Sequence, residues 1–122
     1  MASTFVHYTP AQNPTVKAAE AISAGSFVKV SANIDGRNPV VTAATAGSTP
    51  FGVVAHDVAQ NGHVMVYRAG HIVDIAAAGV IAAGDLVEAG ASGKAAKSAG
   101  TAPVVGIAVS AAANGVVTVA LN

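Results

Sequence analysis

The stretch VIAAGDLVEAG, residues 80–90, repeats a pattern that occurs earlier in the chain as AISAGSFVKVS, residues 21–31. Both stretches contain an Ile, small residues, a Gly and one polar residue, followed by an apolar pair and a charged residue. The Gly permits a tight bend, and the apolar pair after it can enter a core. The pattern therefore predicts a turn that leads into a β-strand, used once in each half of the chain.

A second pair of similar stretches follows the first. PFGVVAHDVAQNGHVMV, residues 50–66, is similar to PVVGIAVSAAANGVVTV, residues 103–119. In both, a Gly opens an apolar strand, small residues follow, and an Asn-Gly turn precedes a strand of alternating Val. The common order of these features indicates two similar halves, residues 21–75 and 80–122, with a composition rich in Ala, Gly and Val as the alternative explanation.

Strand signals dominate the chain from Lys17 onward. Short Val-rich runs are bounded by Gly, Asn, Asp and Pro, as is typical of β-strands separated by turns. Residues 15–25 contain good helix formers and could instead form one or two helical turns. The candidate strands are residues 26–31, 39–42, 52–56, 63–68, 71–75, 86–89, 104–110 and 116–121.

Residues 1–16 differ from the rest of the chain. Pro10 and Pro14 restrict the backbone and remove hydrogen-bond donors, so this segment is predicted to be an extended N-terminal arm. Its apolar side chains Phe5, Val6 and Tyr8 could bind a neighbouring subunit, and a frayed tail is the alternative. The predicted fold is all-β: a small β-barrel or β-sandwich of two similar halves within one domain, residues 17–122, preceded by the arm.

The composition restricts the classes of partner. Hydrophobic residues make up 52% of the 122 residues, but the excess is Ala and Val and only 4% are aromatic. Such a core is thin, so neighbouring copies could complete its burial. Six basic and six acidic residues leave a net charge of zero with no basic stripe, which argues against a nucleic-acid partner. There are no cysteines for disulfides or thiolate metal sites.

The sequence also shows no pattern typical of a membrane span or of a secretory signal. The longest apolar stretch, residues 75–84, is too short and too rich in Ala and Gly to span a bilayer. The N-terminal residues have no apolar segment of the secretory type. We expect a soluble chain that is made in the cytoplasm and has no membrane partner.

Catalytic and metal-binding motifs are not evident around the histidines. His56 beside Asp57 could suggest acid–base chemistry, and His63 and His71 with Asp74 could suggest a metal site. Neither set has the spacing of a known motif, and adjacent strand residues point to opposite faces. We therefore expect surface or interface histidines, no catalytic residue, no metal and no cofactor. The histidines are His7, His56, His63 and His71.

Two long segments of the second half, AAGVIAAGDLVEAG (residues 77–90) and APVVGIAVSAAANGVVTVAL (residues 102–121), resemble the capsid cement proteins of tailed phages, also called head decoration proteins. AISAGSFVKVS and FGVVAHDVAQNGHVMVYRAGHIVDI resemble the same family in the first half. The resemblance implies a structural protein without catalytic residues, on the outer surface of a bacteriophage capsid. It further implies stabilisation of the shell at capsomer junctions through the major capsid protein and neighbouring copies, as a homotrimer made in the host cytoplasm.

Two other classes of protein remain as alternatives. The first is another phage structural module, such as a tail or fibre domain. The second is a biotinyl- or lipoyl-type carrier domain, which also uses turns of this kind and two similar halves. A carrier displays a Lys flanked by Met or Asp, and neither Lys94 nor Lys97 has such a flank.

Overall fold

The computed structural model describes residues 3–4 and 11–122, and within them it confirms an all-β fold. Its only helical element in this part of the chain is one short 3-10 turn, η1 (Ala91–Gly93). The strands are β1 (Thr15–Ala18), β2 (Phe27–Asp35), β3 (Asn38–Ala43), β4 (Gly52–Val54), β5 (His63–Tyr67), β6 (Ile72–Ala76), β7 (Leu86–Ala89), β8 (Ala95–Lys97), β9 (Gly106–Ala108) and β10 (Val116–Leu121).

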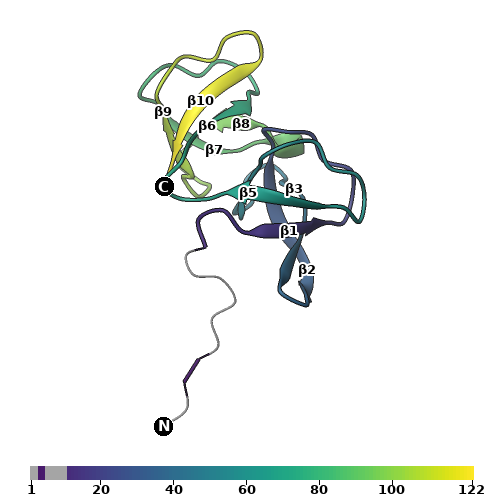
Figure 1. The fold of residues 1–122 in the computed structure, drawn as a ribbon. Helices are drawn as coiled ribbons and strands as arrows, with labels where there is room; N and C mark the ends of the chain where they lie inside the picture. Colours follow the sequence, from purple (N-terminus) through teal and green to yellow (C-terminus); the bar gives the residue numbers. More distant parts are fainter. Residues whose placement is uncertain (1–2, 5–10) are drawn as a thin grey trace.

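Strands β1 to β5 close into a barrel, which we call the first barrel (Figure 1). The strand order is β1-β3-β2-β4-β5, and β1 closes the ring by pairing with β3 in parallel and with β5 in antiparallel fashion. Alternate side chains of each strand point inward, as the two-residue period of a strand requires. The barrel core consists of Val16, Ala18, Ile22, Val28, Val41, Val54, Val64 and Val66.

Strands β6 to β10 form a second sheet in the order β6-β10-β9-β7-β8. This is the order of the first barrel if β6 takes the place of β1, β10 of β5, β9 of β4, β7 of β2 and β8 of β3. The parallel pair that closes the first barrel also has a counterpart, an isolated parallel bridge between Ala77 and Ala95. The second sheet, which we call the second barrel, therefore repeats the strand order of the first but is an open sheet, with this isolated bridge at its seam.

The repeated stretches of sequence occupy matching places in the two barrels. Gly25 and Gly84 both have positive φ, 72° and 89°. Gly25 donates its backbone N–H to Val54 O at 3.0 Å, and Gly84 donates to Ala108 O at 2.7 Å. Val54 and Ala108 occupy the same position in β4 and β9, so both turns tie the start of one strand to the same point of its neighbour. The repeated phrase is a turn module of the barrel.

The two barrels share one apolar core at their junction. Phe27 and Val53 lie on the outer face of the first barrel, yet each is only 1% exposed because both pack with the core of the second barrel. Backbone hydrogen bonds hold the junction together, from Gly93 N to Ala44 O at 2.8 Å and from Gly47 N to Ala89 O at 3.0 Å. The second-barrel side of this core includes Ile75, Ile81, Val87, Ala89, Ala95, Ala108, Val117 and Val119.

Four features differ from the sequence-based expectations. Residues 15–18 form strand β1 and not a helical turn, so the helical alternative is wrong. β1 also begins at Thr15, inside the expected arm, and the short strand β8 was not anticipated. β6 falls in the expected first half, residues 21–75, but pairs with β10 in the second sheet.

Candidate interaction surface

The outer face of the second barrel carries an exposed line of aliphatic side chains across four strands. Ile72 of β6 pairs with Ala120 of β10, Ala120 pairs with Ile107 of β9, and Ile107 pairs with Leu86 of β7. Directly opposed residues of neighbouring strands project from the same face of a sheet. We call these four residues the aliphatic row. Ile72 is 66% exposed, Leu86 51% and Ile107 40%.

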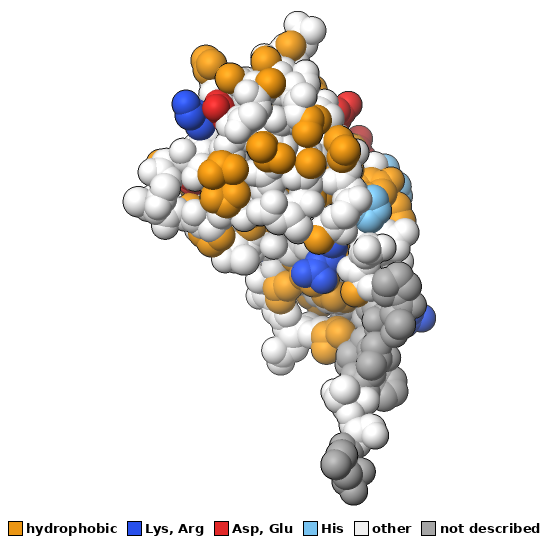
Figure 2. Space-filling view, turned by 90° about the vertical axis from the view of Figure 1, so that its left-hand side faces the viewer, with side chains coloured by type: hydrophobic (Ala, Val, Ile, Leu, Met, Phe, Trp, Pro, Cys, Tyr) orange, Lys and Arg blue, Asp and Glu red, His pale blue; other side chains and the backbone are white. Residues whose placement is uncertain are grey.

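Further apolar side chains extend this surface along the same strands. Val109, next to the end of β9, and Val116 of β10 are 48% and 42% exposed. Figure 2 shows hydrophobic side chains gathered on the part of the molecule that holds the second barrel. Exposed large hydrophobic side chains that are contiguous are typical of interaction surfaces, whereas scattered ones are not. This face is the strongest candidate for a binding surface in the described part of the chain.

The corresponding line of the first barrel is buried at Phe27 and Val53 and half-buried at Tyr67. Phe27 pairs with Val53 and Val53 pairs with Tyr67, which are the positions that Leu86, Ile107 and Ala120 occupy in the second barrel. The second barrel covers Phe27 and Val53. The same row of the module is thus an internal interface in one barrel and an open surface in the other.

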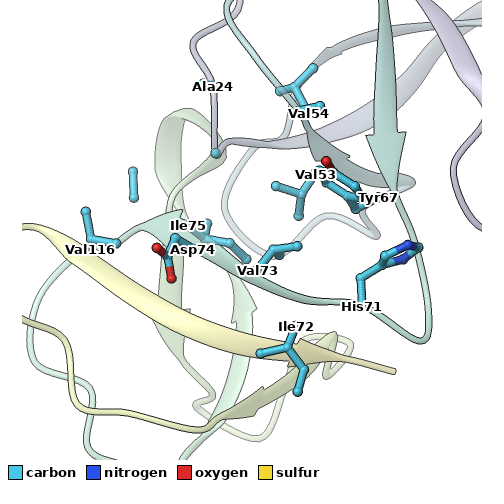
Figure 3. Close-up of a pocket in the computed structure, with 13 residues that line it drawn as sticks. Ala24, Val53, Val54, Tyr67, His71, Ile72, Val73, Asp74, Ile75 and Val116 are labelled. Carbon is cyan, nitrogen blue, oxygen red and sulfur yellow. The ribbon is translucent and has the colours of Figure 1, made fainter.

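A crevice of about 610 Å³ lies between the two barrels beside β6. Figure 3 shows Val53 and Tyr67 of the first barrel facing Val73 and Ile75 of β6 across it. Asp74, which also lines the crevice, accepts a hydrogen bond from the hydroxyl of Thr118 at 2.7 Å. The crevice is therefore mostly apolar, and its carboxylate is already engaged within the sheet.

His56 and His63 lie on separate segments, whereas His71 and Asp74 both line the crevice. Asp57 Oδ1 accepts a hydrogen bond from Ala24 N at 2.7 Å, so this carboxylate holds a loop next to the repeated turn. His56 Nδ1 lies 2.9 Å from the backbone oxygen of Asp57. His63 begins β5, and His71 follows the other end of that strand. Within residues 3–4 and 11–122, no three His, Cys, Asp or Glu side chains are grouped so that they could hold a metal ion.

The β2–β3 hairpin is tied to β1 by an ion pair at the surface. Lys17 Nζ lies 3.0 Å from Asp35 Oδ2. The hydrogen bond and the positive charge of Lys17 lower the pKa of Asp35 from its ordinary value. The pair orients the end of β2 at the surface, where the Asp35 side chain is well solvated and the Lys17 side chain is partly exposed.

The chain that precedes β1 is held against β5 as far as Gln12. Arg68 N donates to Gln12 O at 2.8 Å, and Val66 N donates to Pro14 O at 3.0 Å. The Arg68 guanidinium lies 4.2 Å from the centre of the Phe51 ring, beside a smaller crevice of about 350 Å³. The predicted arm-binding residues Phe5, Val6 and Tyr8, and also His7, lie outside the described residues.

The sequence analysis did not predict the aliphatic row, although the alternation of residues in β7 indicated part of it. In β7, Leu86 alternates with Val87 and shares its face with Glu88. A charged residue two positions away marks the solvent side of a strand, so this alternation indicated an outward Leu86. The short β9, with Gly106, Ile107 and Ala108, contains no charged residue and carried no comparable signal.

The fold and the surface define a class of protein. The second of the two similar barrels presents an open apolar sheet face, which is typical of a structural module that acts by binding other proteins. No helix among the described residues is long and apolar enough to cross a membrane. The family model of phage cement proteins matches residues 7–122, and the chain belongs to that family. It is a phage structural protein associated with the capsid.

A solved structure shows the same fold. The chain is similar to the head fiber gp8.5 N base of bacteriophage phi29, with a TM-score of 0.74 and 24% sequence identity. The similarity covers 90% of this chain and 92% of that chain. No curated protein matches the chain in sequence.

Proposed function

We propose that this protein is a cement protein that binds the outer surface of the phage head, contacts the major capsid protein and stabilises the shell where capsomers meet. Its membership of the phage cement family over residues 7–122 is the observation that carries the proposal. The exposed aliphatic face of the second barrel supports it, because such a face needs a protein partner. The protein acts without catalysis, is made in the host cytoplasm, and assembles with neighbouring copies as a homotrimer.

The physical properties of the chain suit a repeated lattice. The net charge is zero and only 10% of residues are charged, so copies at high local density repel one another weakly. Identical weak contacts that are made simultaneously reinforce one another, because each further contact is effectively intramolecular. Modest apolar surfaces on each copy can therefore produce a large collective stabilisation of the shell.

Binding to heads is the direct test. Purified protein, mixed with expanded heads that lack it, is expected to cosediment to a saturating ratio and to add density on the outer surface in cryo-electron microscopy. Immature heads are the matched control, since the capsomer junctions change on expansion, and we expect no binding to them. Failure to cosediment with expanded heads would contradict the proposal.

A base that holds a fibre on the head is the second candidate. The similar phi29 structure is described as a head fiber base, and the likeness extends over nearly the whole chain. The two candidates differ in what lies above the two barrels. Additional density projecting outward from each bound copy in native virions would favour the fibre base, and two bare barrels would favour the cement role.

The N-terminal arm is proposed to bind a neighbouring subunit through Phe5, Val6 and Tyr8. A deletion that tests this must end at Pro10, because Gln12 is bonded to β5 and Val16 is in the barrel core. We expect removal of residues 1–10 to weaken attachment to heads at least about ten-fold, since aromatic anchors carry much of the energy of an interface. The measurement is head occupancy as a function of protein concentration, with unfolding by urea as the control for barrel stability. Unchanged occupancy would reject a binding role for the arm.

A further inference from the structure

The junction inside one copy has two components. One is the buried row of the first barrel, represented by Phe27, which is 1% exposed. The other is the β7–β8 hairpin of the second barrel, whose Ala89 and Ala95 belong to the same core as Phe27 and whose Gly93 lies against the Phe27 backbone. Within one copy, the buried row of the first barrel is therefore in contact with the β7–β8 hairpin of the second barrel.

Each copy also has a second row and a second hairpin, and neither takes part in the internal junction. The aliphatic row of the second barrel matches the buried row of the first, with Leu86 in place of Phe27. The β2–β3 hairpin of the first barrel matches the β7–β8 hairpin of the second, with Val30 in place of Ala89. Both unused components are open, since Leu86 is 51% exposed and Val30 is 54% exposed.

The β2–β3 hairpin is built to reach beyond its own barrel. β2 has nine residues whereas its counterpart β7 has four, and the added length carries Ile34, which is 47% exposed. Figure 1 shows the hairpin projecting from the lower side of the first barrel, while β9 and β10 lie in the upper part of the molecule. The hairpin and the aliphatic row of one copy therefore cannot meet each other, but those of two copies can.

We propose that the β2–β3 hairpin of one copy docks on the aliphatic row of a second copy of this chain. The contact corresponds to the part of the internal junction in which the β7–β8 hairpin lies on Phe27. Its two sides differ, so the interface is head-to-tail, and it either closes into a ring or extends as a chain according to the rotation between copies. The inference deepens the proposed association of neighbouring copies, and it is tested on the free protein without heads.

The test uses one charged substitution on each side of the contact. Ile107→Glu places a carboxylate in the aliphatic row, and Ile34→Glu places one on the hairpin. Each variant is expected to associate at least about ten-fold more weakly than wild type in sedimentation equilibrium, because the interface would bury an unpaired charge. Val80→Glu is the matched control, because Val80 is 90% exposed and lies in a loop outside both components.

Mixing the two variants gives the decisive result. The Ile107→Glu copy keeps an intact hairpin and the Ile34→Glu copy keeps an intact row, so an equimolar mixture is expected to form a dimer with one copy of each. Circular dichroism is expected to show all three variants folded, since Ile34, Ile107 and Val80 are exposed.

Four outcomes would overturn the inference. They are a monomeric wild type, full association of either single variant, failure of the mixture to dimerise, and loss of head binding by Ile107→Glu with its self-association intact. The last outcome would assign the row to the capsid protein. A wild type that is monomeric yet binds expanded heads would reject the contact between copies and leave the cement role standing.

Discussion

Replacing Gly106 by Ala is expected to destabilise the second barrel strongly. A Cβ at this position would collide with the backbone oxygen of Ala120 and would lie 2.7 Å from Val119 Cγ1. β10 is paired with β9 on one side and β6 on the other, so its backbone has little freedom to move away. We expect a loss of about 3 kcal/mol or more in the free energy of unfolding, measured by urea titration with circular dichroism.

The first barrel provides a repeat of this experiment. Gly52 takes the place of Gly106, and a Cβ there would lie 2.7 Å from the backbone oxygen of Tyr67. Gly52→Ala is therefore expected to be comparably destabilising. Gly79→Ala is the control, because Gly79 has a φ of 85° but no atom within 4 Å of the added Cβ. It should cost only about 1 kcal/mol through backbone conformation. Equal losses for Gly106→Ala and Gly79→Ala would contradict the steric explanation.

Phe27→Ala is expected to cost about 3–5 kcal/mol of unfolding free energy, because it removes the largest buried side chain of the core that joins the barrels. Leu86→Ala is the matched variant, since Leu86 occupies the same place in the second barrel but is 51% exposed. In the monomeric protein its cost is expected to stay below about 1 kcal/mol. The two free energies come from the same urea titrations, at protein concentrations low enough to keep the chain monomeric.

The comparison of these two variants tests the account of the junction. If only the row of the first barrel forms the internal contact, the loss of unfolding free energy must be several-fold larger for Phe27→Ala than for Leu86→Ala. A Leu86→Ala variant as destabilised as Phe27→Ala would mean that the second row is covered within a single copy. In that case the aliphatic row would not be a free surface.

Much of the barrel architecture was predictable from the chain. The turns containing Gly25 and Gly84 and the Asn-Gly pairs were recognised because glycine and asparagine tolerate positive φ, and the structure has Asn61 and Asn114 at 66° and 54°. The eight expected strands correspond to strands of the structure, with differences of up to four residues at their ends. These signals are local, since they depend on the conformations that individual residues permit.

Strands β1 and β8 were missed because their sequences carry weak or mixed strand signals. β8 reads AAK, whose residues are better helix formers than strand formers, and in β1, which reads TVKA, only Thr15 and Val16 favour a strand. The backbone of β1 pairs with β3 and β5, and the backbone of β8 pairs with β7, so neighbouring strands stabilise both elements. Tertiary contacts therefore determined these two elements.

The candidate surface was likewise only partly predictable from the sequence. Leu86 and Glu88 share a face of β7, and this alternation identifies an outward side. The sequence does not distinguish Leu86 from Phe27, which follows an equivalent turn and also precedes a Val and a charged residue. Burial of Phe27 results from the packing of one barrel against the other, which depends on contacts distant in the chain.

The sequence alone determined a pair of similar β modules with glycine-hinged turns, a neutral surface and a resemblance to phage cement proteins, because turn conformation, strand period and charge are local properties of residues. Only the tertiary structure decided that the modules are barrels joined through a buried row and a hairpin, with one row and one hairpin left open. The reason is physical: the two rows are nearly equivalent in sequence, and only the position of a neighbouring barrel makes one a core and the other a surface.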